Sequence, residues 1–218
     1  MASTCPTGVH VAPASASAPR NRLLRLARSL RQCSLCTEDF EPLGHAPRPV
    51  ARLSTTARIC VCGQAPGTHV HRSGLPFDDP SGKRLREWMG LDREQFYDAK
   101  RIVTLPMAFC FPGQDARGAD LPPPPVCSEQ WHERLLDVMP QLKLFLLIGY
   151  HAQRWHLGDQ CRDSLTANVA AWEEFLPSGR IPLPHPSWRN NGWLKKNPWF
   201  ERDLLPILRQ EVHINIIV

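Results

Sequence analysis

The sequence predicts an α/β fold in which helices cover both faces of a parallel sheet. Two observations support this expectation. Four short apolar runs have the length and flanking residues of buried strands, and segments with the periodicity of amphipathic helices lie between them. Strands that alternate with helices pair in parallel, because each helix returns the chain to the same end of the sheet. The 218 residues are enough for one such domain and few for two.

The first elements follow an irregular beginning. Residues 1–20 are rich in Ala, Ser, Pro and Thr without periodicity, so we assign them to a disordered tail and residues 21–218 to one domain. Residues 21–33 place leucines on one stripe and arginines on the other faces, which indicates an amphipathic helix. Residues 57–63, ARICVCG, form an apolar run that ends at a glycine turn. This run predicts the first strand, with its two alternating cysteines in the core.

The remaining elements alternate in the same way. Helical periodicity and caps predict helices over residues 79–90, 92–99, 127–142, from 151 onward, and over 197–211. Continuous apolar runs predict strands over residues 101–107, 143–150 and 180–187. The apolar end HINIIV fits either an extra edge strand or a frayed terminus. Ligands of parallel sheets bind at the carboxyl ends of the strands, so we expect the site in the loops 64–80, 108–114 and 185–191.

The composition favours a polyanionic partner. The net charge is +5, and 21 of the 26 basic residues are arginines, whose planar guanidinium groups bind phosphate in a bidentate manner. A solvated basic surface is the alternative. No apolar run approaches the roughly 20 residues that a membrane helix requires, and the N-terminus has no signal-peptide apolar core. We therefore expect a soluble, cytoplasmic monomer with no membrane partner.

Four cysteines have a spacing that suits a metal centre. Cys33 and Cys36 form a C-x-x-C pair, and Cys110 and Cys127 flank a proline-rich loop with 16 residues between them. Two such pairs can bring four thiolates to a zinc ion or an iron-sulfur cluster. Four unrelated thiols are the alternative. A disulfide framework is not expected in a chain without a secretory signal.

Five motifs, in the same order, resemble those of the uracil-DNA glycosylase superfamily. They are GQAPG with the following GLPF, GLDREQFY with VT, the cysteine pattern, LFLLIG and a late HPS. The chain is most similar to the iron-sulfur, family-four type from about Cys33 to Arg209, while HPSWRN resembles the HPSPRN of the single-strand-selective class. The resemblance implies a three-layer α/β/α sandwich around a four-stranded parallel sheet. It also implies a 4Fe-4S cluster, with zinc as the alternative, on Cys33, Cys36, Cys110 and Cys127.

The resemblance further implies base-excision repair, with removal of uracil or a related deaminated base from DNA. Phe77 would stack on uracil, and His185 would lie near its O2 atom, where negative charge develops as the glycosidic bond breaks. The base must leave the duplex to be reached. The glycine turn after the first strand would let backbone N–H groups approach it. The expected base-binding residues are Gly63, Gln64, Ala65, Phe77 and His185.

The chain departs from the family at the positions that handle water. Gln64 stands where the iron-sulfur family carries an acid, and Ala65 stands where the best-known uracil enzymes carry a water-activating Asp. The Asn expected shortly after the second strand is also absent. Asp78 and Asp79 are the nearest replacement acids, and we favour Asp79, which alternatively caps the helix that follows it. The expected catalytic residues are therefore His185, Asp79 and Gln64.

The segment after HPS offers contacts to DNA. Its basic side chains suit phosphates, and Trp193 with Leu194 could wedge into the stack that the flipped base leaves. A core position for the tryptophan is the alternative. The expected DNA-binding residues are Arg189, Asn190, Trp193, Leu194, Lys195 and Lys196.

Two other functions are compatible with this sequence. The missing acid and Asn would permit a glycosylase fold that binds damaged or single-stranded DNA with little or no hydrolysis. A zinc-stabilised nucleic-acid interaction module with a vestigial pocket is the second alternative. The metal content and the formation of abasic sites separate these three functions.

Overall fold

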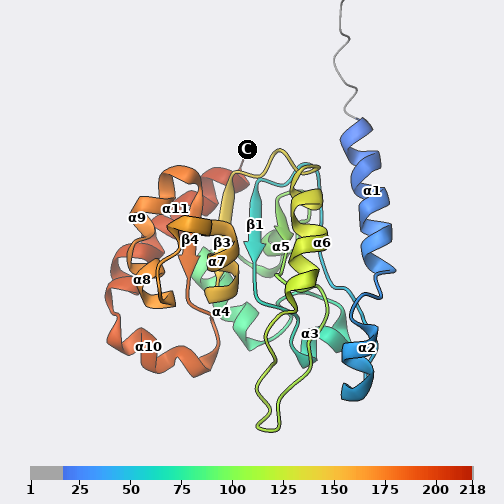
Figure 1. The fold of residues 1–218 in the computed structure, drawn as a ribbon. Helices are drawn as coiled ribbons and strands as arrows, with labels where there is room; N and C mark the ends of the chain where they lie inside the picture. The colour runs from blue at the N-terminus through green and yellow to red at the C-terminus, as the bar shows by residue number, and fades with distance from the viewer. Residues whose placement is uncertain (1–16, 218) are drawn as a thin grey trace, which may run out of the picture.

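The computed structural model describes residues 17–217, and over these residues a four-stranded parallel sheet lies between two layers of helices (Figure 1). The predicted α/β/α architecture is thereby confirmed. The strands are β1 (Ile59–Cys62), β2 (Ile102–Thr104), β3 (Leu144–Ile148) and β4 (Arg180–Leu183). Their order in the sheet is β2-β1-β3-β4.

The central strand β1 fixes the register of the sheet. Ile59 aligns with Ile102 of β2 on one side and with Leu144 of β3 on the other, and Phe145 of β3 aligns with Arg180 of β4. All of these pairings are parallel, so the carboxyl ends of the strands meet at one edge. In Figure 1 the strand arrows point down to this edge, where the long loop between β2 and α6 also lies.

One face of the sheet receives the odd-numbered side chains of β1. Ile59 and Val61 are fully buried there in a core shared with four helices. These helices are α4 (Pro80–Met89), α5 (Arg93–Phe96), α8 (Leu165–Ala170) and α11 (Leu205–Ile216). The burial of the apolar face of the sheet against this one layer of helices is the main stabilising term on this side.

The other face receives Cys60 and Cys62, which are fully buried as expected. The helices on this side are α1 (Ser17–Arg31), α6 (Pro125–Leu136) and α7 (Tyr150–Leu157). Helix α1 stands beside α6 at the margin of the domain (Figure 1) and buries Leu23 and Leu30. Shorter helices lie in the connections: α2 (Thr37–Phe40), α3 (Thr68–Ser73), α9 (Trp172–Phe175) and α10 (Asn191–Lys196).

The structure differs from the sequence prediction at both ends. Residues 17–20, which we assigned to the tail, are the first turn of α1, and the rest of the tail lies outside the described residues. The predicted last helix begins instead as a π-helical turn, Phe200–Leu204, because Pro206 has no N–H to give to the preceding turn. The apolar end continues α11 to Ile216, since Val212 and Ile216 pack into the core.

Across the described part of the chain, no helix has the length and apolar character needed to cross a membrane.

Candidate functional site

A pocket of about 100 Å³ lies at the carboxyl edge of the sheet. The structure brings together there all five residues that we expected to form a base-binding site, from loops after β1 and β4. We call this the base pocket, and it is defined by Gly63, Gln64, Ala65, Phe77 and His185. The carboxylates of Asp79 and Asp120 also line it.

An open groove of about 510 Å³ adjoins the base pocket. The groove shares Asp79, Asp120 and His185 with the pocket and continues along residues 186–190 and Arg84. A ligand too large for the pocket can therefore lie in the groove and insert one group into the pocket. This arrangement suits a polymer with a protruding ring.

Phe77 presents its ring to the pocket from an unusual backbone. Its φ of 55° lies in the left-handed region, which is a genuine outlier for a bulky residue and costs about 1–3 kcal/mol. The ring passes so close to Gly63 that a Cβ there would lie 3.3 Å from Cζ of Phe77. It meets Phe96 edge to face at 6.1 Å between centroids. The side chain is only partly buried and lines the pocket, so part of the ring is accessible for stacking.

Helix α4 holds this strained turn in place. A Cβ on Gly82 would lie 1.8 Å from the carbonyl oxygen of Phe77, so only glycine allows the approach. The same oxygen accepts a hydrogen bond from the guanidinium of Arg86 at 3.3 Å. One residue earlier, the carbonyl of Pro76 accepts a hydrogen bond from the hydroxyl of Tyr97 at 2.9 Å. The position of Phe77 is therefore imposed by its surroundings.

Asp79 is the N-cap of α4. Its Oδ1 accepts hydrogen bonds from the N–H of Gly82 at 2.8 Å and from the hydroxyl of Ser81 at 2.6 Å. This is the structural alternative that the sequence left open for Asp79. Its neighbour Asp78 forms an ion pair with Arg93 at 3.1 Å. Within the described residues, Asp78 is absent from the lining of the pocket.

His185 is held as a neutral hydrogen-bond donor. Its Nδ1 accepts the N–H of Ser187 at 3.2 Å, and its carbonyl accepts the side-chain amide of Asn190 at 2.7 Å. Burial lowers the pKa of His185, and this effect exceeds the opposite influence of the Asp79 and Asp120 carboxylates. A neutral imidazole that accepts at Nδ1 carries its proton on Nε2. Nε2 is then the group that can donate to a ligand.

Three residues beside this site were not predicted from the sequence. Asp120 belongs to a hairpin after β2, and nothing in the proline-rich sequence around it indicates that it meets His185. Trp188 lines the groove with 70% of its surface exposed, and Arg189 lies over its ring at 5.9 Å. Arg84 donates to the carbonyl of Ser187 at 3.2 Å. The exposed aromatic residue, Trp188, lies within the HPSWRN motif.

Helix α10 divides the expected DNA-binding residues into two groups. Lys195 and Lys196 are exposed. Trp193 is half-buried, donates its indole N–H to Thr166 at 2.7 Å, and packs against Trp199 at 5.8 Å between centroids. These contacts favour the core alternative for Trp193. Leu194 is likewise half-buried against the core.

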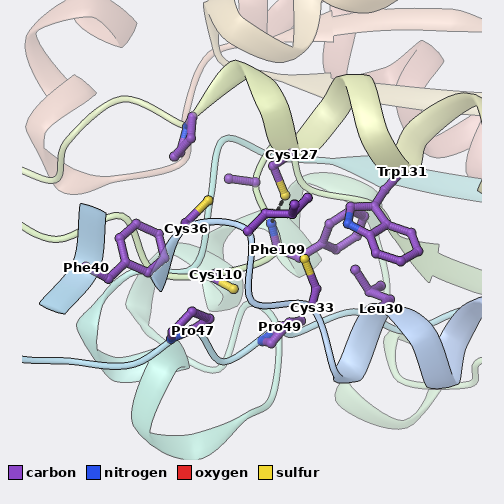
Figure 2. Close-up of a pocket in the computed structure, with 13 residues that line it drawn as sticks. Leu30, Cys33, Cys36, Phe40, Pro47, Pro49, Phe109, Cys110, Cys127 and Trp131 are labelled. Atoms are coloured by element: carbon purple, nitrogen blue, oxygen red, sulfur yellow. Dashed lines mark hydrogen bonds between the residues drawn. The ribbon is translucent and has the colours of Figure 1, made fainter. Parts of the chain in front are cut away.

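A second, apolar pocket is lined by four cysteines, Cys33, Cys36, Cys110 and Cys127, and we call it the cysteine pocket. In Figure 2 the four side chains surround a shared space, with Cys33 just after α1 and Cys127 on α6. Burial, reinforced by neighbouring thiols, raises the pKa of Cys110 to about 12 and that of Cys127 to about 11. The N–H of Phe109 donates to the sulfur of Cys127 at 3.3 Å.

Whether this pocket fits a metal centre depends on the types of its donor atoms and on how closely they converge. Four thiols facing one apolar space are the ligand set of an iron-sulfur cluster or of structural zinc. However, among residues 17–217 no three His, Cys, Asp or Glu side chains converge closely enough to hold a single metal ion. The ligand types therefore fit, while the convergence that one zinc ion requires is absent from the described residues.

The model of a family described as the uracil DNA glycosylase superfamily matches residues 51–209. This range contains the base pocket, the groove, Cys110 and Cys127. Cys33 and Cys36 precede it.

Proposed function

This chain belongs to the uracil DNA glycosylase superfamily, whose members are typically DNA glycosylases, hydrolases of the N-glycosidic bond. We therefore propose that it excises uracil or a related deaminated base. The observation that carries the proposal is His185, whose Nδ1 accepts the N–H of Ser187 and leaves Nε2–H free as a donor in the base pocket. The pocket and groove together fit a flipped nucleotide and its flanking strand.

The base pocket supplies the binding part of the reaction. Extrusion of a base from a duplex costs about a few kcal/mol, which stacking and edge hydrogen bonds must offset. Phe77 offers an aromatic ring, and the backbone after Gly63 lies close enough to approach the base. The strained turn at Phe77 is held by Gly82, Arg86 and Tyr97, so the ring needs little rearrangement to stack.

His185 supplies the electrostatic part. As the glycosidic bond breaks, its electron pair leaves with the base, and negative charge gathers on the base oxygen. A neutral imidazole N–H in a site shielded from water stabilises that charge, and losing one such donor costs about 10²–10³ in rate. Asn190, which we expected to bind DNA directly, holds the carbonyl of His185 and thereby positions the loop.

The DNA-facing surface lies along the groove and α10. Arg189, Lys195 and Lys196 are exposed there and suit phosphate oxygens. Trp188 is better exposed than Trp193 and is our candidate to fill the space left by the flipped base. None of these contacts requires a particular DNA sequence, so selection would occur in the base pocket.

The cysteine pocket supports a 4Fe-4S cluster on Cys33, Cys36, Cys110 and Cys127. Each ligand of such a cluster binds a different iron, so the thiolates need not converge on one point. When bound, the cluster would supply a structural cross-link between the segment before the family domain and the loop after β2. A brown protein that absorbs near about 400 nm and contains about four irons supports this proposal; a colourless zinc protein supports the alternative ligand.

The decisive experiment measures abasic sites. Purified protein is incubated with oligonucleotides that carry uracil, hypoxanthine, xanthine or only normal bases, and the strands are then cleaved with alkali. We expect cleavage at uracil or at one of the deaminated purines and none in normal DNA. Binding of the lesion strand without cleavage would favour a non-hydrolytic DNA-binding protein, which Gln64 and Ala65 at the acid positions make the second candidate.

A further inference from the structure

The base pocket still lacks a group that handles the attacking water. The pocket is lined by the carboxylates of Asp79 and Asp120. Asp79 directs Oδ1 to Ser81 and Gly82 as the cap of α4. Oδ1 of Asp79 is therefore committed to holding the helix that fixes Phe77, and protonation of this carboxylate during the reaction would weaken that cap.

Asp120 is delivered to the pocket by a hairpin over residues 113–121. The N–H of Leu121 donates to the carbonyl of Gly113 at 2.9 Å, and Gln114 pairs with Asp120 across the hairpin. The side-chain amide of Gln64 reaches the carbonyl of Leu121 at 3.5 Å. The hairpin is thus joined to the first loop of the base pocket.

Asp120 lies where the pocket meets the groove, since its side chain lines both. Its Oδ1 accepts the amide of Gln114 at 3.0 Å. Its Oδ2 lies 3.5 Å from where a Cβ on Gly67 would be, and within residues 17–217 no hydrogen bond or ion pair to Oδ2 is found. Asp120 also lies near enough to influence the charge of His185. One oxygen is therefore held and the other is available beside the base pocket.

We propose that Asp120 is the residue that binds and deprotonates the attacking water, an inference that rests on the proposed excision of a base. The water oxygen forms a bond to C1′ of the sugar while the bond from C1′ to the base nitrogen breaks. The electron pair of that bond leaves with the base, whose charge His185 stabilises, and the water proton passes to Oδ2 of Asp120. The base anion then takes a proton from solvent, and Asp120 returns its own to solvent. The hydrogen bond from the side-chain amide of Gln114 fixes the orientation of the Asp120 carboxylate.

The test compares aspartate-to-asparagine variants under single-turnover conditions on the best lesion substrate. Asp120→Asn keeps an oxygen for Gln114 but cannot accept the proton, so the rate should fall about 10²–10⁴-fold. Asp115→Asn is the matched control, because Asp115 lies in the same hairpin and accepts only from the backbone N–H groups of Arg117 and Ala119. Its rate should stay within about threefold of the wild type.

Two further measurements separate chemistry from structure. Affinity for the lesion strand, measured by fluorescence anisotropy, and the melting temperature should be unchanged in Asp120→Asn. Asp120→Glu should recover part of the rate, and added formate should accelerate Asp120→Ala.

Each contrary outcome has a distinct meaning. Wild-type rates in Asp120→Asn, or a larger loss in Asp79→Asn than in Asp120→Asn, would overturn the assignment to Asp120 and leave base excision intact. A parallel loss of rate and DNA affinity would give Asp120 a structural role and also overturn it. A wild-type protein inactive on every lesion would overturn the proposed function and this inference together.

Discussion

The base pocket and the cysteine pocket both use residues of the connection after β2 but differ in construction. The base pocket combines polar and apolar side chains and opens on a groove of about 510 Å³. The cysteine pocket is lined almost wholly by apolar side chains and thiols and has a free volume of about 10 Å³. The first opens on the groove and can admit a ligand from solvent, and the second is a small apolar space between four thiols. Substitutions in the first should therefore change the rate, and substitutions in the second should change the stability.

The largest effect tests the catalytic side of this comparison. His185→Ala removes the Nε2–H donor, and we expect the single-turnover rate on the lesion strand to fall about 10²–10³-fold. The free energy of unfolding should fall by only about 1 kcal/mol, from the lost acceptor for the Ser187 N–H. His151→Ala is the control, because His151 is exposed on α7. A loss of stability in His185→Ala as large as its loss of rate would break the comparison.

The next effect belongs to the cysteine pocket. Cys127→Ser buries a hydroxyl in place of a thiol, and we expect the free energy of unfolding to fall by about 1–3 kcal/mol, together with loss of any bound iron. Cys161→Ser changes a half-buried thiol outside the pocket and should keep the iron. Chemical denaturation and metal analysis measure both. If the rate per folded Cys127→Ser molecule fell as far as that of His185→Ala, the two pockets would not be independent.

A pH effect of intermediate size lies on the cysteine side. Burial lowers the pKa of His132 on α6 to about 4, against about 6.5 in the unfolded chain. As the pH falls below about 6.5, the unfolded state binds a proton that the folded state does not, so stability is full above that pH and declines toward pH 4. We expect a loss of about 2 kcal/mol between pH 7 and pH 5. Urea titrations of His132→Gln, which can still donate to the carbonyl of Pro106, should show a loss that is smaller by this amount. The part due to His156, whose pKa burial lowers to about 3, should remain.

The smallest effect concerns the groove. Trp188→Ala removes an exposed ring without changing charge, so DNA affinity should weaken by about 1–2 kcal/mol while its salt dependence stays the same. Arg189→Ala should instead reduce the salt slope by about one. Anisotropy titrations at several salt concentrations distinguish the two. An unchanged affinity in Trp188→Ala would remove this tryptophan from the DNA-facing surface.

Most of the fold could be predicted because its signals are local. The run around Ile59 is apolar, short and ends in a glycine turn, and such a run has few alternatives to a buried strand. The helix over His213–Ile216 could not be predicted this way, since His-Ile-Asn-Ile favours a strand by propensity. Packing of Val212 and Ile216 into the core decides the conformation there, and packing is not visible in a short window of sequence.

The site was predictable where one motif supplies a strand end and its side chain together. His185 follows β4 directly, and Phe77 belongs to the GLPF motif in the loop after β1, so both reach the pocket at the carboxyl edge of the sheet. Asp120 is different, because it reaches His185 through a hairpin whose direction depends on tertiary contacts. Trp193, which we expected at the DNA, and Trp188 are both aromatic neighbours of basic residues, and only burial, which the sequence does not show, separates them.

The left-handed turn at Phe77 sets stability and function against each other. Glycine or asparagine would relieve the strain of a positive φ, yet neither carries a ring that can lie on a base. Selection for a more stable protein alone would replace this phenylalanine, whereas selection for base recognition keeps it and requires Gly82 to remain a glycine. The residues that descendants of this chain carry at the positions of Phe77 and Gly82 should therefore show which of the two pressures acts.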